Sequence, residues 1–147
     1  MCSLSPDEQR NRIASFLAHQ RTGVLSTTVS PGVWAIPVWY RPDFSPSSSH
    51  NMEVDCLVPR WTDLGHHLMQ EHAVVLIVQA SSGAGLRWLQ IQGTARPLEA
   101  PIWDKLLPRW ISTTQPDALY LVVRVTPSRI DLVDEDQGWG VQETLEW

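Results

Sequence analysis

The hydrophobic residues follow a helical period at the start of the chain and a strand period after it. Ile13, Phe16 and Leu17 have the i, i+3, i+4 spacing that places side chains on one helix face. The preceding string Ser5-Pro6-Asp7-Glu8 combines a capping box with a proline at the first helical position. The pattern predicts an amphipathic helix that begins after this cap and ends before Gly23.

Six strands are predicted after this helix, from apolar or alternating segments separated by turn residues. They span residues 24–30, 34–41, 52–58, 73–80, 87–96 and 119–125, and residues 130–133 extend the sixth. The turn signal Pro31-Gly32 joins the first two as a hairpin. Pro37 places the second strand at an edge or at a break in the ladder, because proline cannot donate a ladder hydrogen bond.

Two of these strands allow more specific predictions. The run Val74-Val75-Leu76-Ile77-Val78 is apolar throughout, which predicts a strand buried on both faces. In the next strand Leu89, Ile91 and Ala95 alternate with polar residues, so one face is expected in the core. Gly93 interrupts this alternation and indicates a bulge or a close backbone approach.

Two short helices are predicted between the strands, at residues 63–72 and 101–110. Thr62 caps the first, and Leu64 and Leu68 form its apolar face. Trp103 and Trp110 lie seven residues apart in the second, so they share a face and are predicted to be in the core.

Helices this sparse do not alternate with strands as they would in a doubly wound fold. We therefore expect a mainly β (α+β) fold, a six-stranded antiparallel barrel with a few peripheral helices, in a single domain over residues 1–147.

Tryptophan is unusually frequent, with eight residues against two phenylalanines and two tyrosines. Indole is large and carries an N–H donor that needs a partner when buried, so it rarely serves as plain core filler. The excess indicates flat surfaces for a planar ligand, or a large interface.

Charge and hydropathy narrow the classes of partner. The net charge is −5, and residues 131–147 form an acidic C-terminal tail with six acids and no base. A nucleic-acid partner is therefore not expected. No apolar run reaches the roughly 18 residues of a membrane span and no signal peptide is seen, so no membrane association is expected. The two cysteines are not placed as a disulfide framework, which indicates a reducing compartment. We therefore expect a cytoplasmic protein.

Four strings, in their order and spacing, resemble the FMN-binding split-barrel family related to pyridoxamine 5′-phosphate oxidase. They are Thr22–Thr27, Ile36–Tyr40, Thr62–Leu68 running into Ala73–Val78, and Arg87–Ala95. The resemblance implies a homodimer of split barrels, with flavin mononucleotide (FMN) in two equivalent clefts at the subunit interface. It also implies an oxidoreductase that acts on a small-molecule substrate, which the sequence does not name.

The resemblance implies eight cofactor-binding residues in three groups. The residues expected beside the isoalloxazine, through backbone and side chain, are Val38, Trp39 and Tyr40. The residues expected near the phosphate are Arg60, Trp61 and Thr62, and those facing the cofactor from the following strand are Trp88 and Gln90. No catalytic acid or base is assigned, because the flavin itself would carry the hydride chemistry.

The sequence departs from the family at the phosphate end. Many members carry a Ser-Arg-Lys-like string where this chain has Thr62-Asp63-Leu64. Asp63 puts a negative charge near the expected phosphate and Leu64 offers none, so two charge-assisted hydrogen bonds are lost. Arg41 and Arg60 are the candidate substitutes. The basic residues expected around a second phosphate, that of the substrate, are also sparse. Pyridoxamine phosphate oxidase activity itself is therefore not expected.

Two other functions remain open. The chain could be a non-redox split-barrel module that binds haem, another planar ligand or a protein partner. It could also be a relative that uses a deazaflavin, which shares the fold and differs in the charged tail. No metal site is predicted, since on the expected helical face of Asp63, His67 and Glu71 only one histidine is present.

Two further residues stand apart from these patterns. Arg124 lies in an apolar strand, and an ion pair with one of the C-terminal acids is favoured over a phosphate or a substrate carboxylate. Trp139, between two glycines in the acidic tail, is a candidate lid over a partner's cleft.

Overall fold

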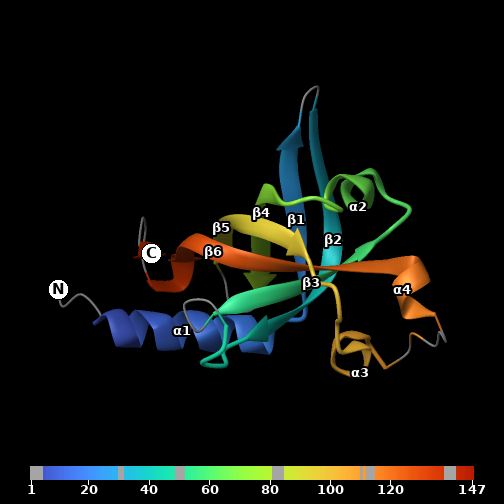
Figure 1. Cartoon of the computed structure of the whole chain (residues 1–147). Coiled ribbons are helices and arrows are strands. Elements are labelled where there is room, and N and C mark those ends of the chain that lie inside the picture. The colour runs from blue at the N-terminus through green and yellow to red at the C-terminus, as the bar shows by residue number, and fades with distance from the viewer. Residues whose placement is uncertain are drawn as a thin grey trace.

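An antiparallel barrel of six strands forms the centre of the molecule (Figure 1). The computed structural model describes residues 5–29, 32–48, 52–80, 85–109, 111, 115–137 and 142–147. Its strands are β1 (Thr22–Val29), β2 (Gly32–Asp43), β3 (Glu53–Pro59), β4 (His72–Ala80), β5 (Arg87–Pro97), β6 (Tyr120–Asp134) and β7 (Gln142–Glu146). Its α-helices are α1 (Pro6–His19), α2 (Asp63–His67), α3 (Trp103–Leu106) and α4 (Pro116–Leu119).

The barrel closes through a pair of strands far apart in sequence. The sheet order is β3-β2-β1-β4-β5-β6, and β3 also pairs with β6 to complete the ring. All of these pairs are antiparallel, so the predicted six-stranded antiparallel barrel is confirmed. In the described part of the chain β7 pairs only with β6, outside the barrel. We did not predict β7, because Leu145 is its one apolar residue and the tail is otherwise acidic.

Helix α1 forms as its cap predicts. The Ser5 hydroxyl accepts from the Glu8 backbone N–H, and the Glu8 carboxylate accepts from the Ser5 N–H. Ile13, Phe16 and Leu17 are buried and join the barrel core. The helix lies against the barrel in Figure 1 and covers that side of the core.

Strand β4 is buried on one face only, so the prediction of a strand buried on both faces was wrong. Val74, Leu76 and Val78 point into the core, whereas the intervening residues face outward. Ile77 is 38% exposed, and its cross-strand neighbour Val24 is 41% exposed. The apolar run of β4 therefore indicates an exposed apolar surface on the outside of the barrel, which a partner or ligand could bury.

Both predicted short helices end early. Helix α2 stops at His67 and His72 already lies in β4, so Asp63, His67 and Glu71 do not share a helical face. Helix α3 has four residues and none of them is buried, so Trp103 is not a core residue; Trp110 lies outside the described residues. Leu107 is extended because it precedes Pro108, which ends the helix. Among the described residues no helix has the length and apolar composition to cross a membrane.

The two irregular strand positions behave as predicted. The β5–β6 register shifts between Gln92 and Gly93, which is the expected bulge. Residues 32–38 of β2 pair with β1 but not with β3, so Pro37 lies where the strand is at an edge. Strand β6 continues through Pro127 to Asp134, which confirms the extension of the sixth strand.

Arg124 does not pair with the C-terminal acids, contrary to prediction. Its guanidinium forms two hydrogen bonds with Asp55, of 2.8 and 2.9 Å, and a third with Asp43 at 3.1 Å. Glu53 lies 3.6 Å away. The reason is topological: barrel closure places Asp55 directly across from Arg124 on β3. The tail acids pair elsewhere, with partners that include Arg12, Arg87 and Arg129.

Candidate functional site

The three residues expected beside an isoalloxazine point in opposite directions from β2. Val38 and Tyr40 are buried in the core, and the Tyr40 hydroxyl donates to the Leu17 carbonyl at 2.8 Å. Burial, together with the nearby Cys56, raises the pKa of Tyr40. Their side chains are therefore used by the fold, and these two residues can approach a cofactor only through backbone. Trp39 points outward and is partly exposed.

Trp39 shares an outer face of the barrel with Trp88 and Gln90. One cross-strand row runs Pro37, Val24, Ile77, Gln90 over β2, β1, β4 and β5. The outermost strands of this row are β2 and β5. Trp39 lies two residues from Pro37 on β2, Trp88 lies two residues from Gln90 on β5, and both are on the same side of the row. We call these six residues the outer-face patch. Its two indoles are separated by three strand spacings, about 14 Å, which would leave room for a planar ring system between them.

The residues expected at the phosphate end lie elsewhere, after β3. The Thr62 hydroxyl donates to the Pro59 carbonyl at 2.7 Å and accepts from the Gly65 N–H at 3.0 Å. Arg60 donates through Nε to the carbonyls of Asp117 and Tyr120. Trp61 is 64% exposed and lies with Thr62 beside a cavity of about 430 Å³.

This segment fits a phosphate dianion poorly. The Thr62 hydroxyl already caps α2, Asp63 is exposed and negative, and Leu64 is turned into the core. Arg60 is the one cation in the segment, and its Nε is committed to backbone carbonyls. The structure thus brings Trp39, Trp88 and Gln90 onto one face and leaves Arg60, Trp61 and Thr62 in a separate place.

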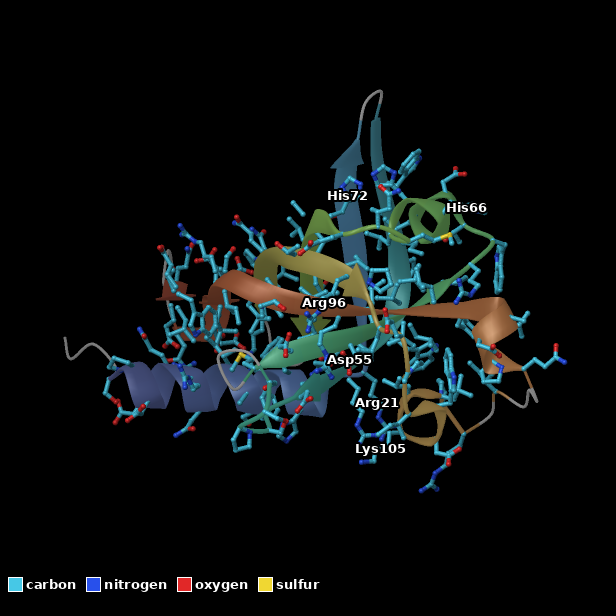
Figure 2. The ribbon with its side chains drawn as sticks, viewed as in Figure 1. Arg21, Asp55, His66, His72, Arg96 and Lys105 are labelled. Atoms are coloured by element: carbon cyan, nitrogen blue, oxygen red, sulfur yellow. The ribbon has the colours of Figure 1, made fainter. Side chains whose placement is uncertain are left out.

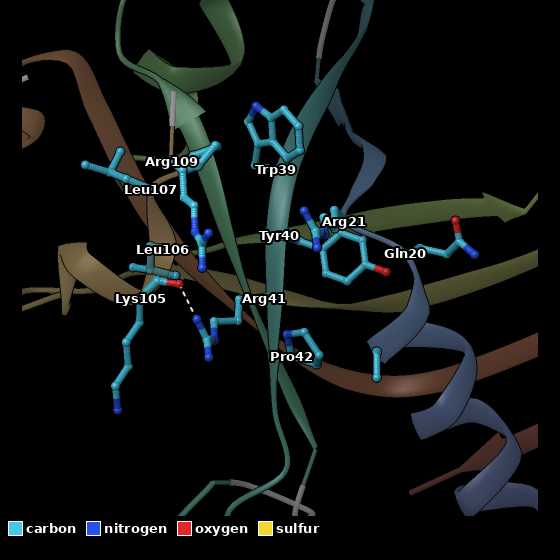
Figure 3. A pocket seen from close by; sticks show the side chains of 12 residues that line it. Gln20, Arg21, Trp39, Tyr40, Arg41, Pro42, Lys105, Leu106, Leu107 and Arg109 are labelled. Carbon is cyan, nitrogen blue, oxygen red and sulfur yellow. Dashed lines mark hydrogen bonds between the residues drawn. The ribbon is translucent and has the colours of Figure 1, made fainter. Parts of the chain in front are cut away.

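A larger cavity opens on the other side of Trp39. It has a volume of about 710 Å³ and lies between the end of α1, strand β2 and the α3 segment (Figure 3). Its lining includes Arg21, Arg41, Lys105 and Arg109. No local sequence pattern marks this cluster, because its members come from three segments up to 88 positions apart and only folding brings them together.

His66 and His72 lie at the opposite end of the barrel from Arg21 and Lys105 (Figure 2). The ring of His67 lies 4.0 Å from that of His72, and Trp34 meets His67 edge-on at 5.2 Å. The Nε2 atom of His67 is buried, and no described residue forms a hydrogen bond with it. Within the described residues no three metal-ligating side chains come together.

Acidification should destabilise the protein through His67. Burial first, and the neighbouring His72 second, lower the pKa of His67. The unfolded chain then takes up this proton at a higher pH than the folded chain, so stability falls as the pH drops through about 6.5, the ordinary histidine pKa. The loss is complete below the folded pKa.

Urea unfolding between about pH 7.5 and pH 5 measures this effect. His67→Phe should flatten the pH dependence, whereas His66→Phe, at an exposed position, should leave it intact. An unchanged pH dependence in His67→Phe would contradict the assignment.

Comparisons with known proteins give structural relatives only. No family model matches the sequence, and no curated protein matches it significantly. A pyridoxinephosphate oxidase family protein from Clostridium acetobutylicum, related to general stress protein 26, superposes with a TM-score of 0.68. It is 10% identical, and the match covers 97% of this chain and 96% of that protein.

Two proteins from Mycobacterium smegmatis also match, each 17% identical. The FAD-binding protein superposes with a TM-score of 0.59 over 98% of both chains. The haem-binding protein superposes with a TM-score of 0.65 over 99% of this chain but 60% of its own, so this chain spans under two thirds of that protein.

The chain has the split-barrel fold. Closure of β1–β6 and the agreement with pyridoxinephosphate oxidase family structures decide this point. Solved proteins with this split barrel include a flavin binder and a haem binder, so the fold accommodates planar cofactors of both kinds. The identities are too low to carry residue roles, which therefore have to come from this chain's own geometry.

Proposed function

We propose that this split-barrel protein binds FMN on the outer-face patch, between two copies of the chain, and acts as an oxidoreductase on a small molecule. The observation that carries the proposal is the patch itself. Val24 and Ile77 are large apolar residues left exposed in the middle of a sheet, and indoles flank them on both sides. Monomeric proteins rarely expose such surfaces without a function.

The chemistry of the patch suits a flavin ring. The apolar row and the two indoles offer contact to a planar ring, and the Gln90 amide can hydrogen-bond a polar flavin edge. The FAD-binding neighbour of the same fold supports a flavin. A deazaflavin would occupy the same surface. When bound, the flavin would supply hydride transfer, and the chain would supply position and exclusion of water.

A homodimer follows from the same surface. A second copy placed over the patch would bury Val24 and Ile77 and enclose a ring that a single face leaves half in water. A reducing, cytoplasmic setting is part of the proposal, since Cys56 is a buried free thiol.

Ile77→Glu tests the proposed interface and the proposed cofactor together. A carboxylate in the centre of the patch should convert the dimer to a monomer and weaken FMN binding at least tenfold, because a buried unpaired charge is costly. Light scattering gives the mass, and flavin absorbance near ~450 nm with an FMN titration gives the affinity. Gln92→Glu adds the same charge at an exposed position of β5 and should change neither.

Measurements on the wild-type protein alone can contradict the proposed function. A wild-type protein that is monomeric, carries no flavin and does not bind added FMN would overturn the proposal. Mass spectrometry of ligand released on denaturation separates FMN from a deazaflavin.

A haem module is the second candidate, and one observation favours it. The rings of His67 and His72 lie 4.0 Å apart and are tilted by 32°, and the buried Nε2 of His67 has no hydrogen-bond partner among the described residues, which supports an imidazole ligand for a planar iron cofactor. The haem-binding neighbour shares the fold. A Soret band on haem addition that is lost in a His67→Phe/His72→Phe double variant would favour haem over flavin.

A further inference from the structure

The cavity beside the Thr62 segment has aromatic side chains and a negative charge in its wall. Its volume of about 430 Å³ is in the range of small-molecule sites. The described residues that line it are 34–36 of β2 and 61–64 at the start of α2, which lies beside β2 (Figure 1). Two of these residues are tryptophan, one is an acid and none is basic. The cavity thus combines two indoles with one carboxylate.

Other rings hold both indoles in position. The rings of Trp34 and His67 meet edge-on with their centroids 5.2 Å apart, and Trp34 is partly buried against the barrel core. Trp61 lies tilted against Tyr120 at 6.0 Å and is 64% exposed, so most of its surface is open to a ligand. The face of an indole carries partial negative charge and attracts a cation within about 6 Å of the ring centre. The aromatic part of this wall therefore favours a positively charged ligand.

Asp63 supplies the formal charge of the cavity, and no neighbouring base neutralises it. In the described part of the chain no basic side chain forms an ion pair with its carboxylate. Arg60 instead donates through Nε to two backbone carbonyls, in α4 and at the start of β6. Burial first and His72 second lower the pKa of His67, so its ring adds no positive charge beside Trp34 at neutral pH.

We propose that this cavity binds the methylated ammonium group of a small organic cation. Proteins recognise quaternary ammonium ligands through aromatic side chains placed around the charge, and the indoles of Trp34 and Trp61 offer such surfaces. Asp63 provides the counter-charge. A phosphate would meet this carboxylate and no cation among the described lining residues. The features that make the segment unsuitable for an anion therefore suit a ligand of the opposite charge.

This site is separate from the outer-face patch. The two share no residue, although Ile36 in the cavity wall directly precedes Pro37 of the patch. Binding of the cation therefore does not depend on binding of the proposed flavin, and either proposal can fail without the other.

Calorimetric titration of the full chain with choline tests the site. The comparison ligand is the uncharged carbon isostere of choline, in which a tert-butyl group replaces the trimethylammonium group. Choline should bind with saturation and about tenfold more tightly than the isostere, because only the charged group is attracted by the indoles and by Asp63.

Two variants in the cavity have matched controls outside its lining. Trp61→Leu should weaken choline binding about tenfold, whereas Trp147→Leu, which removes another exposed indole, should change it less than twofold. Asp63→Asn should weaken choline binding about fivefold, whereas Glu71→Gln removes the same charge at another exposed position and should change it less than twofold. Trp61 and Asp63 are both exposed, so thermal unfolding of all four variants should match that of the wild type.

Three results would overturn the proposal. The first is the absence of saturable choline binding by the wild-type protein. The second is equal affinity for choline and its isostere, which would show an apolar cavity that does not recognise charge. The third is a loss in Trp147→Leu or Glu71→Gln as large as that in the matching cavity variant, which would show that the cation does not bind in this cavity.

Discussion

Arg124→Ala should lower the free energy of unfolding by about 3–5 kcal/mol, the range for breaking a buried ion pair by removing one partner. The guanidinium serves three carboxylates at once, on Asp43, Glu53 and Asp55. Glu53 is 2% exposed, and Asp55 is 9% exposed. Hydrogen bonding to Asp55 raises the pKa of Arg124 above its already high value, so the charge is permanent. Without it, buried negative charges repel one another or must take up protons.

Urea unfolding followed by circular dichroism measures the loss at neutral pH. Arg129→Ala is the matched control on the same strand. Arg129 is 42% exposed and pairs with Asp131, which keeps hydrogen bonds from Gln142 and Thr144. The control should cost less than about 1 kcal/mol, as exposed pairs do. Equal losses in the two variants would show that the Arg124 cluster contributes no more than a surface contact.

The partners of Arg124 could not be found from the sequence, because they depend on barrel closure. Asp55 and Arg124 are 69 positions apart and meet only when β3 pairs with β6. Periodicity reports which face of a strand is buried, but not which strand lies next to it. The acids near the C-terminus form the most obvious group of negative charges in the sequence. The prediction that Arg124 pairs with one of them was therefore wrong.

Sequence patterns predicted the structure correctly where interactions between residues close in sequence determine it. The α1 cap formed as its spacing requires, and Leu89, Ile91 and Ala95 are buried as their alternation predicts. The pattern failed for β4, because an apolar run does not distinguish a face buried within the chain from a face left open. The short helices were overestimated because residues of helical period continued past the points where α2 and α3 end.

The site was predictable to a smaller degree. The strings that carry the family resemblance lie on the strands that form the outer-face patch, so Trp39, Trp88 and Gln90 share one face. The phosphate end was chosen from the family string, but here Leu64 serves the core and Thr62 serves the cap of α2. The basic cavity has no local signature, since its cations are scattered along the chain. Only the tertiary fold brings them together.

Gly93→Val should destabilise the barrel by about 3 kcal/mol or more, at the upper end of overpacking effects. A Cβ atom at Gly93 would lie 2.3 Å from the Thr126 carbonyl oxygen and 3.0 Å from the Pro127 Cα. Both contacts are to backbone, so no side-chain rotation relieves them, and the β5–β6 bulge would have to open.

Thermal and urea unfolding of Gly93→Val measure this cost. Thr94→Val places the same side chain one position further along β5, where it is exposed, and should change stability by less than about 0.5 kcal/mol. Gly93→Ala should already show most of the loss, because the clash arises at Cβ. If both Gly93 variants were as stable as Thr94→Val, the bulge would be loose enough to accept a side chain. The close approach of β5 to β6 would then not be what requires glycine at this position.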